Sequence, residues 1–369
     1  MGGIVMLNLC AEKMLNVKVI GVGGAGKNIV NRMMAEEVGG IDFVVVSTDR
    51  RELNDTNCPT KVLIGEELTG GVGTGSNFDI GKKCAEASTD AIAKILEGAD
   101  LVFITAGMGG GTGTGAAPVI AELAREAGIL TIGVVTKPFS FEGKPRMKQA
   151  EAGVADLEAK VDALITVPGN CLKDIIDQKI NFANGFAIAD DFLKQILTAI
   201  PDGIKDDPNM LINLDLADVS AIMRNSGRAS VGFGVATGEE RAAKAAKMAL
   251  SGPLMKNCID SATGAILIIS GSCEMSLNEI DTITQHVMDA TKPDANIIFG
   301  ASMSAELGDE IRVTLLAADF DEKSKKKPRT GEFYSALSSE KLNDASDAFS
   351  PKPEFDINDI DAILDLFKG

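Results

Sequence analysis

One stretch of this sequence decides the fold: Gly107-Met108-Gly109-Gly110-Gly111-Thr112-Gly113-Thr114-Gly115, or GMGGGTGTG. It follows a strand-like run at residues 101–106 and precedes a helix-like run at 116–127. Glycines let the backbone wrap an anion closely, threonines add hydroxyl donors, and a helix N-terminus adds positive potential. The stretch therefore predicts a phosphate-binding loop. Its candidate binding residues are Gly109, Gly110, Gly111, Thr112, Gly113, Thr114 and Gly115.

Two more glycine-rich loops favour the same chemistry. Residues 21–28 (GVGGAGKN) lie between a strand-like and a helix-like run, and residues 70–75 (GGVGTG) form a third loop of this kind. Three converging loops suit a triphosphate better than a structural turn. The candidate residues here are Gly23, Gly24, Ala25, Gly26, Lys27, Asn28 and Gly73.

The loop at residues 21–28 also fits other interpretations. As GxGxxG it is typical of dinucleotide-binding folds, with Asp49 where a ribose-binding acid is expected. As a P-loop it fails, because Asn28 stands where a Ser or Thr hydroxyl binds magnesium. An NAD(P)-dependent oxidoreductase thus remains an alternative, although it explains only this loop, and a glycine-rich packing turn is another.

The chain as a whole shows the pattern of an α/β fold. Short, β-branched apolar runs at 17–22, 43–48, 101–106, 130–135 and 163–167 alternate with helical segments. Nearly continuous hydrophobicity in these runs indicates parallel strands that are covered on both faces, as in a doubly wound sheet. A helical stretch from residue 185 leads to Pro201, which is expected to kink or end it. Beyond it, strand-like and helix-like runs predict a second, smaller α/β domain.

Composition narrows the possible partners. The 369 residues carry a formal net charge of -17, which disfavours nucleic-acid binding and contact with anionic lipid. No apolar stretch approaches the ~20 residues of a membrane-spanning helix, and residues 1–15 lack the features of a secretory signal. Six scattered cysteines show no CxxC spacing. We therefore expect a cytoplasmic protein without direct membrane insertion.

The motifs resemble those of the tubulin/FtsZ superfamily, and the chain is most similar to bacterial FtsZ cell division proteins. GGGTGTG at 109–115 is similar to the superfamily signature, and GVGGAGKN at 21–28 resembles the first FtsZ loop. The likeness extends through 136–144 (TKPFSFEGK), 213–219 (NLDLADV), 234–242 (GVATGEERA) and 309–317 (DEIRVTLLA), and covers roughly residues 17–320.

The resemblance implies a domain plan. It divides the chain into an N-terminal extension (1–16), a GTP-binding domain (17–184), a central helix and connection (185–212), and a C-terminal polymerisation and GTPase-activating domain (213–320). A polar stretch at 321–355 is expected to be a disordered, flexible linker, because it is too polar to bury a core. An apolar-acidic peptide at 356–369 ends the chain and is expected to bind division adaptors or membrane-tether proteins.

The resemblance also implies roles for single residues. Glu142 and Arg146 would contact the ribose and phosphate region of GTP or GDP, and Mg²⁺ would be bound through the nucleotide rather than by protein ligands. Phe186 would stack on the base, while Asp190 would accept hydrogen bonds from guanine N1–H and the 2-amino group.

Hydrolysis is assigned by the same resemblance to the loop that holds Asn213, Asp215 and Asp218. In the FtsZ family this loop enters the nucleotide site of the next subunit, where carboxylates orient water. Taken alone, the loop also fits a plain helix start in which Asp215 caps residues 216–223. The implied function is a GTPase that polymerises head to tail and forms the contractile division ring at the septum, at midcell. A paralogue that binds GTP, assembles and hydrolyses poorly is the alternative.

Overall fold

The computed structural model describes residues 15–36, 38–171, 182–204, 210–255 and 258–320. The predicted linker, the predicted C-terminal peptide and residues 1–14 lie outside the described residues. Those that are described belong to one compact unit.

The first half is built on six parallel strands, which confirms the predicted doubly wound sheet. They are β1 (Val17–Val22), β2 (Ile41–Ser47), β3 (Thr60–Leu63), β4 (Leu101–Gly107), β5 (Leu130–Lys137) and β6 (Ala163–Pro168). Their order in the sheet is β3-β2-β1-β4-β5-β6. Most residues of the inner strands are buried, as expected for strands that are covered on both faces.

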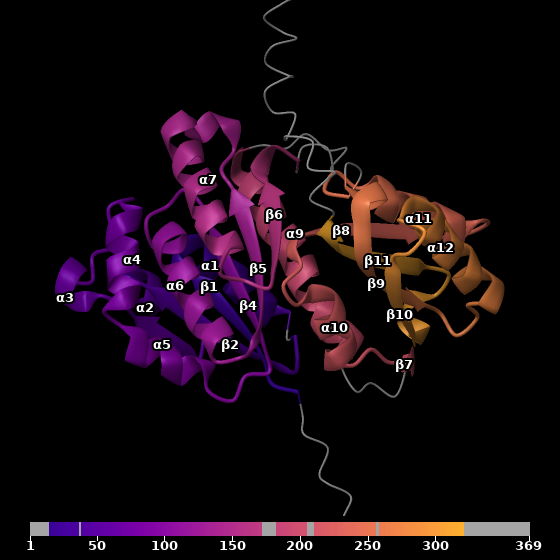
Figure 1. Ribbon diagram of the computed structural model, residues 1–369, viewed down its shortest axis with the longest axis horizontal. Helices are drawn as coiled ribbons and strands as arrows, with labels where there is room; N and C mark the ends of the chain where they lie inside the picture. The colour runs from indigo at the N-terminus through magenta and orange to yellow at the C-terminus, as the bar shows by residue number, and fades with distance from the viewer. Residues whose placement is uncertain (1–14, 37, 172–181, 205–209, 256–257, 321–369) are drawn as a thin grey trace, which may run out of the picture. The chain divides into compact units, whose positions relative to one another are not determined.

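Helices cover both faces of this sheet (Figure 1). One core cluster includes residues of α1 (Gly23–Ala35) and of the central helix α9 (Phe182–Ile204). The opposite cluster includes residues of α4 (Phe78–Glu86), α5 (Thr89–Leu96), α6 (Thr112–Glu126) and α7 (Lys144–Glu158). Shorter helices are α2 (Arg50–Asn54), α3 (Glu66–Thr69), η1 (Ser140–Glu142) and η2 (Gly169–Cys171).

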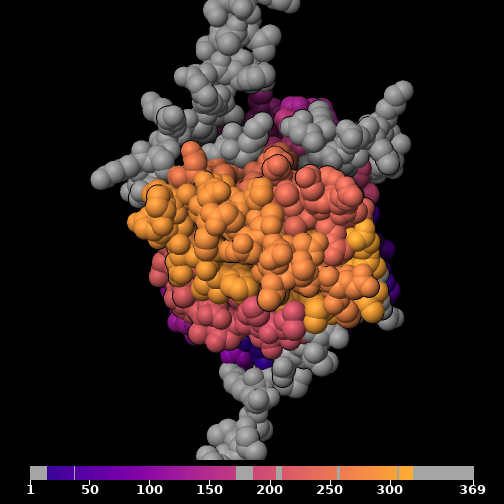
Figure 2. Space-filling model, turned by 90° about the vertical axis from the view of Figure 1, so that its right-hand side faces the viewer, coloured from indigo at the N-terminus to yellow at the C-terminus, as the bar shows by residue number. Residues whose placement is uncertain are grey.

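The second half combines strands and helices, as predicted for a smaller α/β domain, and its strands form a mixed sheet. Its strands are β8 (Gly227–Ala236), β11 (Ile311–Phe320), β9 (Ala262–Gly271), β10 (Asn296–Met303) and β7 (Met210–Ile212), in that order across the sheet. β9 and β10 are parallel, and the other pairs are antiparallel. The helices are α10 (Leu216–Met223), α11 (Arg241–Ser251), α12 (Leu277–Ala290), η3 (Ile259–Ser261) and η4 (Ala305–Leu307). Residues of this half, coloured from salmon through orange to yellow, make up most of the face in Figure 2.

The two halves share one continuous sheet, which the sequence did not reveal. β6 pairs in parallel with β8, in the register Ala163↔Gly227. Asp162 lies at this junction with 1% of its surface exposed. Its carboxylate accepts hydrogen bonds from the backbone N–H of Thr131 at 3.0 Å and of Asn225 at 3.3 Å. The buried carboxylate thus ties the start of β5 to the turn before β8.

The sequence predicted that Pro201 would kink or end the central helix, and the second of these outcomes is wrong. α9 begins at Phe182 and continues through Pro201 to Ile204. Proline removes a single backbone donor, and the last turn is held by packing, since Ile200 is buried. A Cβ on Gly203 would lie 2.8 Å from the Ile268 side chain, so this turn sits close against the second sheet. Within the described residues, no helix combines the length and apolar character required to cross a bilayer.

Candidate functional site

The strand order creates a crevice between β1 and β4. These strands pair in parallel, with Val22 opposite Ala106. β2 and β3 follow on the far side of β1, and β5 and β6 follow on the far side of β4. In open α/β sheets such a reversal leaves a crevice at the carboxyl ends of the strands, where ligands bind. The first predicted loop follows β1 and the GMGGGTGTG loop follows β4, so both lie at this edge (Figure 1).

Two helices present uncapped N-termini at the crevice. α1 starts at Gly23 and α6 starts at Thr112. Neither helix has a side-chain hydrogen bond at its N-cap or an acidic residue in its first turn. By contrast, α4 is capped by Asn77 and α12 by Ser276. The free N–H groups and the positive end of the helix dipole therefore face this edge at two neighbouring places, which suits an anion.

A cavity of about 350 Å³ lies against these N-termini. It is lined by residues of all three glycine-rich loops and by two carboxylates, which agrees with the expectation that the loops converge. The predicted residues among its lining are Gly23, Gly24, Ala25, Gly73, Gly110, Gly111, Thr112, Gly113 and Arg146. The others are Val22, Asp49, Glu52, Val72, Thr74, Gly75, Ser76 and Gly107. We call this space the loop cavity.

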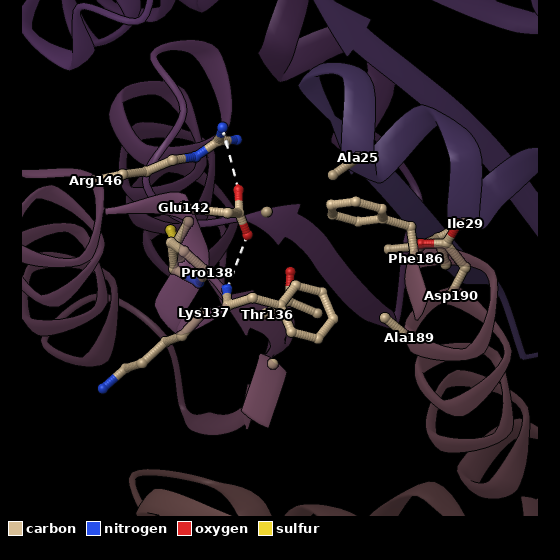
Figure 3. A pocket seen from close by; sticks show the side chains of 14 residues that line it. Ala25, Ile29, Thr136, Lys137, Pro138, Glu142, Arg146, Phe186, Ala189 and Asp190 are labelled. Atoms are coloured by element: carbon tan, nitrogen blue, oxygen red, sulfur yellow. Dashed lines mark hydrogen bonds and ion pairs between the residues drawn. The ribbon is translucent and has the colours of Figure 1, made fainter. Parts of the chain in front are cut away.

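A second, smaller cavity of about 80 Å³ adjoins the first, because Ala25, Gly107 and Arg146 line both. It is lined by the predicted residues Glu142, Phe186 and Asp190, and also by Thr136, Phe139 and Ala189 among others. In Figure 3, Phe186, Ala189 and Asp190 project from one helix and face Glu142 and Arg146 across the space. We call it the ring cavity.

Aromatic rings gather at the ring cavity. Phe186 is 43% exposed, and its ring meets that of Phe139 edge-on, with centroids 5.4 Å apart. Phe139 in turn stacks on Phe141 at 5.1 Å. A large apolar ring that is this exposed offers solvent-accessible surface on which a planar base can stack.

Asp190 supplies an acceptor beside Phe186. Burial raises the pKa of its carboxyl to about 6, while Arg32, whose Nε lies 3.5 Å from Asp190 Oδ2, opposes the rise. Arg32 also donates to Asp191 Oδ1 at 2.6 Å. An ionised carboxylate can accept both guanine donors, N1–H and the 2-amino group, whereas adenine offers no such pair.

Glu142 and Arg146 form an ion pair on the opposite wall, with Arg146 Nη1 3.2 Å from Glu142 Oε2 (Figure 3). Glu142 Oε1 also accepts a hydrogen bond from the Phe139 backbone N–H at 2.8 Å. Arg146 lines both cavities, so its guanidinium is placed to contact a phosphate, a ligand that it can bind with two parallel hydrogen bonds.

Six of the predicted binding residues line neither cavity: Gly26, Lys27, Asn28, Gly109, Thr114 and Gly115. Several of them make contacts that hold the loops in shape. A Cβ on Gly26 would lie 2.6 Å from Thr105 O, and one on Gly115 would lie 2.1 Å from Phe78 O. Thr114 Oγ1 accepts a hydrogen bond from Gly109 N at 2.8 Å. The buried Lys27 ammonium pairs with Asp55 at 3.0 Å.

The predicted catalytic residues lie in the second half: Asn213 and Asp215 lie between β7 and α10, and Asp218 lies in the first turn of α10. Asn213 and Asp215 are exposed and Asp218 is half-buried, and none of them lines the loop cavity or the ring cavity. Asp215 is the N-cap of α10, so the helix and cap that were also predicted for this stretch are confirmed. A single chain does not bring these carboxylates to the glycine loops.

Other lining residues were not assigned from the sequence. Thr136 is the next-to-last residue of β5, and Phe139 lies two residues beyond the end of that strand. Their place at the carboxyl end of a parallel strand is a signal that would have found them. Thr74 belongs to the third glycine loop. Glu52 lies in the five-residue helix α2, where no pattern in the sequence indicates a site.

Comparison with known proteins identifies the family. Residues 16–177 match the profile described as "Tubulin/FtsZ family, GTPase domain", and residues 227–321 match "FtsZ family, C-terminal domain". A dimer of FtsZ from M. jannaschii is 39% identical, with 82% of this chain and 88% of that chain covered and a TM-score of 0.77. The chain belongs to the FtsZ family. It carries the tubulin-like GTPase domain of that family, which binds GTP or GDP.

A second FtsZ structure agrees with this assignment, and a more distant protein shares the fold. A point mutant of M. jannaschii FtsZ is also 39% identical, covers 83% of this chain and 91% of that chain, and has a TM-score of 0.78. CetZ2 from Haloferax volcanii shares the fold at 19% identity, with a TM-score of 0.72 over 88% of this chain and 99% of that chain. Membership of the FtsZ family overturns the dinucleotide interpretation, although the first-half strand order is that of dinucleotide folds.

Proposed function

We propose that this FtsZ-family protein polymerises head to tail and hydrolyses GTP at the contacts between subunits. The observation that carries the proposal is that the phosphate-binding cavity and the predicted catalytic residues lie apart in the chain. The loop cavity offers helix N-termini for phosphates, whereas Asn213, Asp215 and Asp218 belong to the other half of the chain and line neither cavity. A site divided in this way is completed when the β7–α10 loop of one subunit meets the loop cavity of the next.

In this proposal the two cavities divide the nucleotide between them. The phosphates lie in the loop cavity, at the N-termini of α1 and α6, with Arg146 as a cationic partner. Guanine lies in the ring cavity, against Phe186 and within reach of Asp190, and Glu142 contacts the ribose region. Ala25 and Gly107, which line both cavities, lie where the loop cavity adjoins the ring cavity.

Hydrolysis then depends on orientation and charge rather than on covalent chemistry. Asp215 and Asp218 position a water molecule for in-line attack on the γ-phosphate of the neighbouring subunit, and Asn213 adds an amide. Mg²⁺, bound through the nucleotide, would offset phosphate charge. Asp49 and Glu52 line the loop cavity with oxygen donors of the kind that suit this ion and its waters.

At the level of the cell, we propose that the polymer forms the contractile division ring at midcell. FtsZ-family membership supports this role. The peptide at 356–369 is proposed to bind adaptors or membrane-tether proteins, and it lies outside the described residues.

A second candidate is an FtsZ-family scaffold that binds GTP and assembles but hydrolyses it weakly. It is favoured by one observation: Asp215 and Asp218 are both engaged in capping α10, which is a structural use of the two carboxylates.

The experiment that separates these candidates measures phosphate release from GTP with Mg²⁺ across a series of protein concentrations, with light scattering in parallel. Activity per molecule that rises together with scattering above a threshold concentration is the expected result. Scattering without phosphate release would establish the scaffold. No response to GTP, against ATP and NADH as controls, would refute both.

A further inference from the structure

Glu52 places a carboxylate against the first phosphate loop. Its Oε1 lies so near Gly24 that a Cβ added there would be 2.7 Å from this oxygen. Gly24 is the second residue of α1, whose N-terminus carries no side-chain cap. Glu52 and Gly24 both line the loop cavity. The Glu52 carboxylate thus lies at the helix N-terminus where the proposed function places the phosphates.

The position of this carboxylate is held by neighbouring groups. Glu52 Oε2 accepts a hydrogen bond from Ser47 Oγ at 2.5 Å. Ser47 is fully buried at the end of β2, and its Oγ also accepts from the Asp49 backbone N–H at 3.1 Å. The adjacent Leu53 is 6% exposed and belongs to the core. Glu52 is therefore oriented by the sheet rather than free to swing into solvent.

The charges of the loop cavity are unusual for a phosphate site. Its lining contains two carboxylates, those of Asp49 and Glu52, and one cationic side chain, that of Arg146. Arg146 is already paired with Glu142. Lys27, the cation of the first loop, lies outside the lining and pairs with Asp55. Helix N-termini attract the phosphates, but the acidic wall repels them.

We infer that Glu52 makes tight nucleotide binding depend on a divalent cation. This inference rests on the proposed nucleotide site and adds its regulation. Without the cation, Glu52 and the phosphates are like charges at the same helix N-terminus. With the cation, the excess negative charge of phosphate and carboxylate is offset, and the repulsion is removed. Glu52 thus favours binding of the nucleotide with its divalent cation over binding of the nucleotide without it.

The test compares the wild-type protein with Glu52→Gln. Glutamine keeps an oxygen that can accept from Ser47 Oγ, so the side chain keeps its place and loses only its charge. Glu67→Gln is the matched control, because Glu67 is an exposed acid of the neighbouring α3 that does not line the cavity. The dissociation constant of GDP is measured by calorimetry in excess EDTA and in Mg²⁺, at constant ionic strength, with circular dichroism to check the fold.

The expected result is that Glu52→Gln binds GDP about tenfold more tightly than wild type in EDTA, and within about threefold of it in Mg²⁺. Glu67→Gln should follow the wild type in both. An equal EDTA-to-Mg²⁺ ratio of dissociation constants in wild type and Glu52→Gln would overturn the role of Glu52, although GDP binding itself would still support the site. If the folded wild type bound no GDP in Mg²⁺, the site assignment would fail as well.

Discussion

Asp215 and Asp218 hold each other's backbone at the start of α10. Asp215 Oδ1 accepts a hydrogen bond from Asp218 N at 2.6 Å, and Asp218 Oδ2 accepts one from Asp215 N at 3.1 Å. Each bond uses one carboxylate oxygen, and among the described residues the other oxygens accept no hydrogen bond. The capping box therefore orients both carboxylates and leaves one oxygen of each available. Helix capping and the orientation of water are compatible uses of the same two residues.

Asp215→Asn separates the two uses. Asparagine caps helices about as well as aspartate, so the melting temperature should stay within a few degrees of wild type. Phosphate release from GTP should fall at least about tenfold, because the carboxylate that orients water is lost, while GDP affinity stays unchanged. Asp215→Ala should in addition lose about 1 kcal/mol of unfolding free energy. Full GTPase activity of a well-folded Asp215→Asn protein would argue against the catalytic assignment.

Gly110 and Gly115 should respond differently to alanine. A Cβ on Gly110 would meet only Gly107 O, at 3.9 Å, so it fits the protein but intrudes on the loop cavity. We expect Gly110→Ala to weaken GDP binding several-fold with an unchanged melting temperature. A Cβ on Gly115 would lie 2.1 Å from Phe78 O, so Gly115→Ala should lower the unfolding free energy by about 1–3 kcal/mol. Equal effects of both substitutions on stability would contradict this division of roles.

Asp190 should make GDP binding sensitive to pH. Its pKa of about 6 means that the carboxyl is mostly ionised at pH 7.5 and mostly protonated at pH 5. Protonation removes an acceptor for the guanine donors, so GDP affinity should drop about tenfold between these values. Titration by calorimetry checks this drop. Asp190→Asn should bind weakly at every pH, and a wild-type pH profile in this variant would refute the role of Asp190.

The same raised pKa affects the stability of the free protein in a defined direction. Burial disfavours the ionised form of Asp190, so its pKa of about 6 lies above the ordinary value of 3.8. Stability from this group is therefore fully present below pH 3.8 and is lost as the pH rises through 6. Relative to Asp190→Asn, the wild type should lose roughly 2 kcal/mol over this window in urea unfolding. A constant difference between the two proteins would contradict the burial argument.

Arg241 should be essential for the stability of the second half. Its side chain is 10% exposed and pairs with Glu279 at 2.6 Å and with Asp309 at 2.6 Å. Arg241→Ala leaves Glu279 without its cationic partner, with only Ser276 among the described residues still donating to it, and should cost about 3 kcal/mol in unfolding free energy.

The Arg241 hydrogen bond lowers the pKa of Glu279 from 4.5 to about 2. The stability that this pair contributes is present above pH 4.5 and is lost as the pH falls toward 2. Acid unfolding of wild type, Arg241→Ala and Glu279→Gln measures this contribution. A wild-type acid midpoint in both variants would show that the network adds nothing.

Local sequence predicted the parts of the site that depend on local conformation. A glycine run between a strand and a helix indicates an anion loop, and Asp215 before an apolar run indicates a capped helix; the structure has both loop and cap in place. The same reasoning assigned Gly115 and Lys27 to the ligand. The local pattern does not distinguish a glycine that lines the loop cavity from one whose added Cβ would meet Phe78 O, because both occur in the same glycine run.

By itself, then, the sequence determined that three glycine loops exist, that parallel strands precede two of them, and that an acidic loop lies in the other half of the chain. These features follow from backbone freedom and hydrophobic periodicity, which are local properties. Only the tertiary structure decided that Glu52 lies against Gly24, that Asp162 joins the two halves, and that Asp215 lines neither cavity. Those relationships depend on strand order and register, which bring together residues that no short stretch of sequence relates.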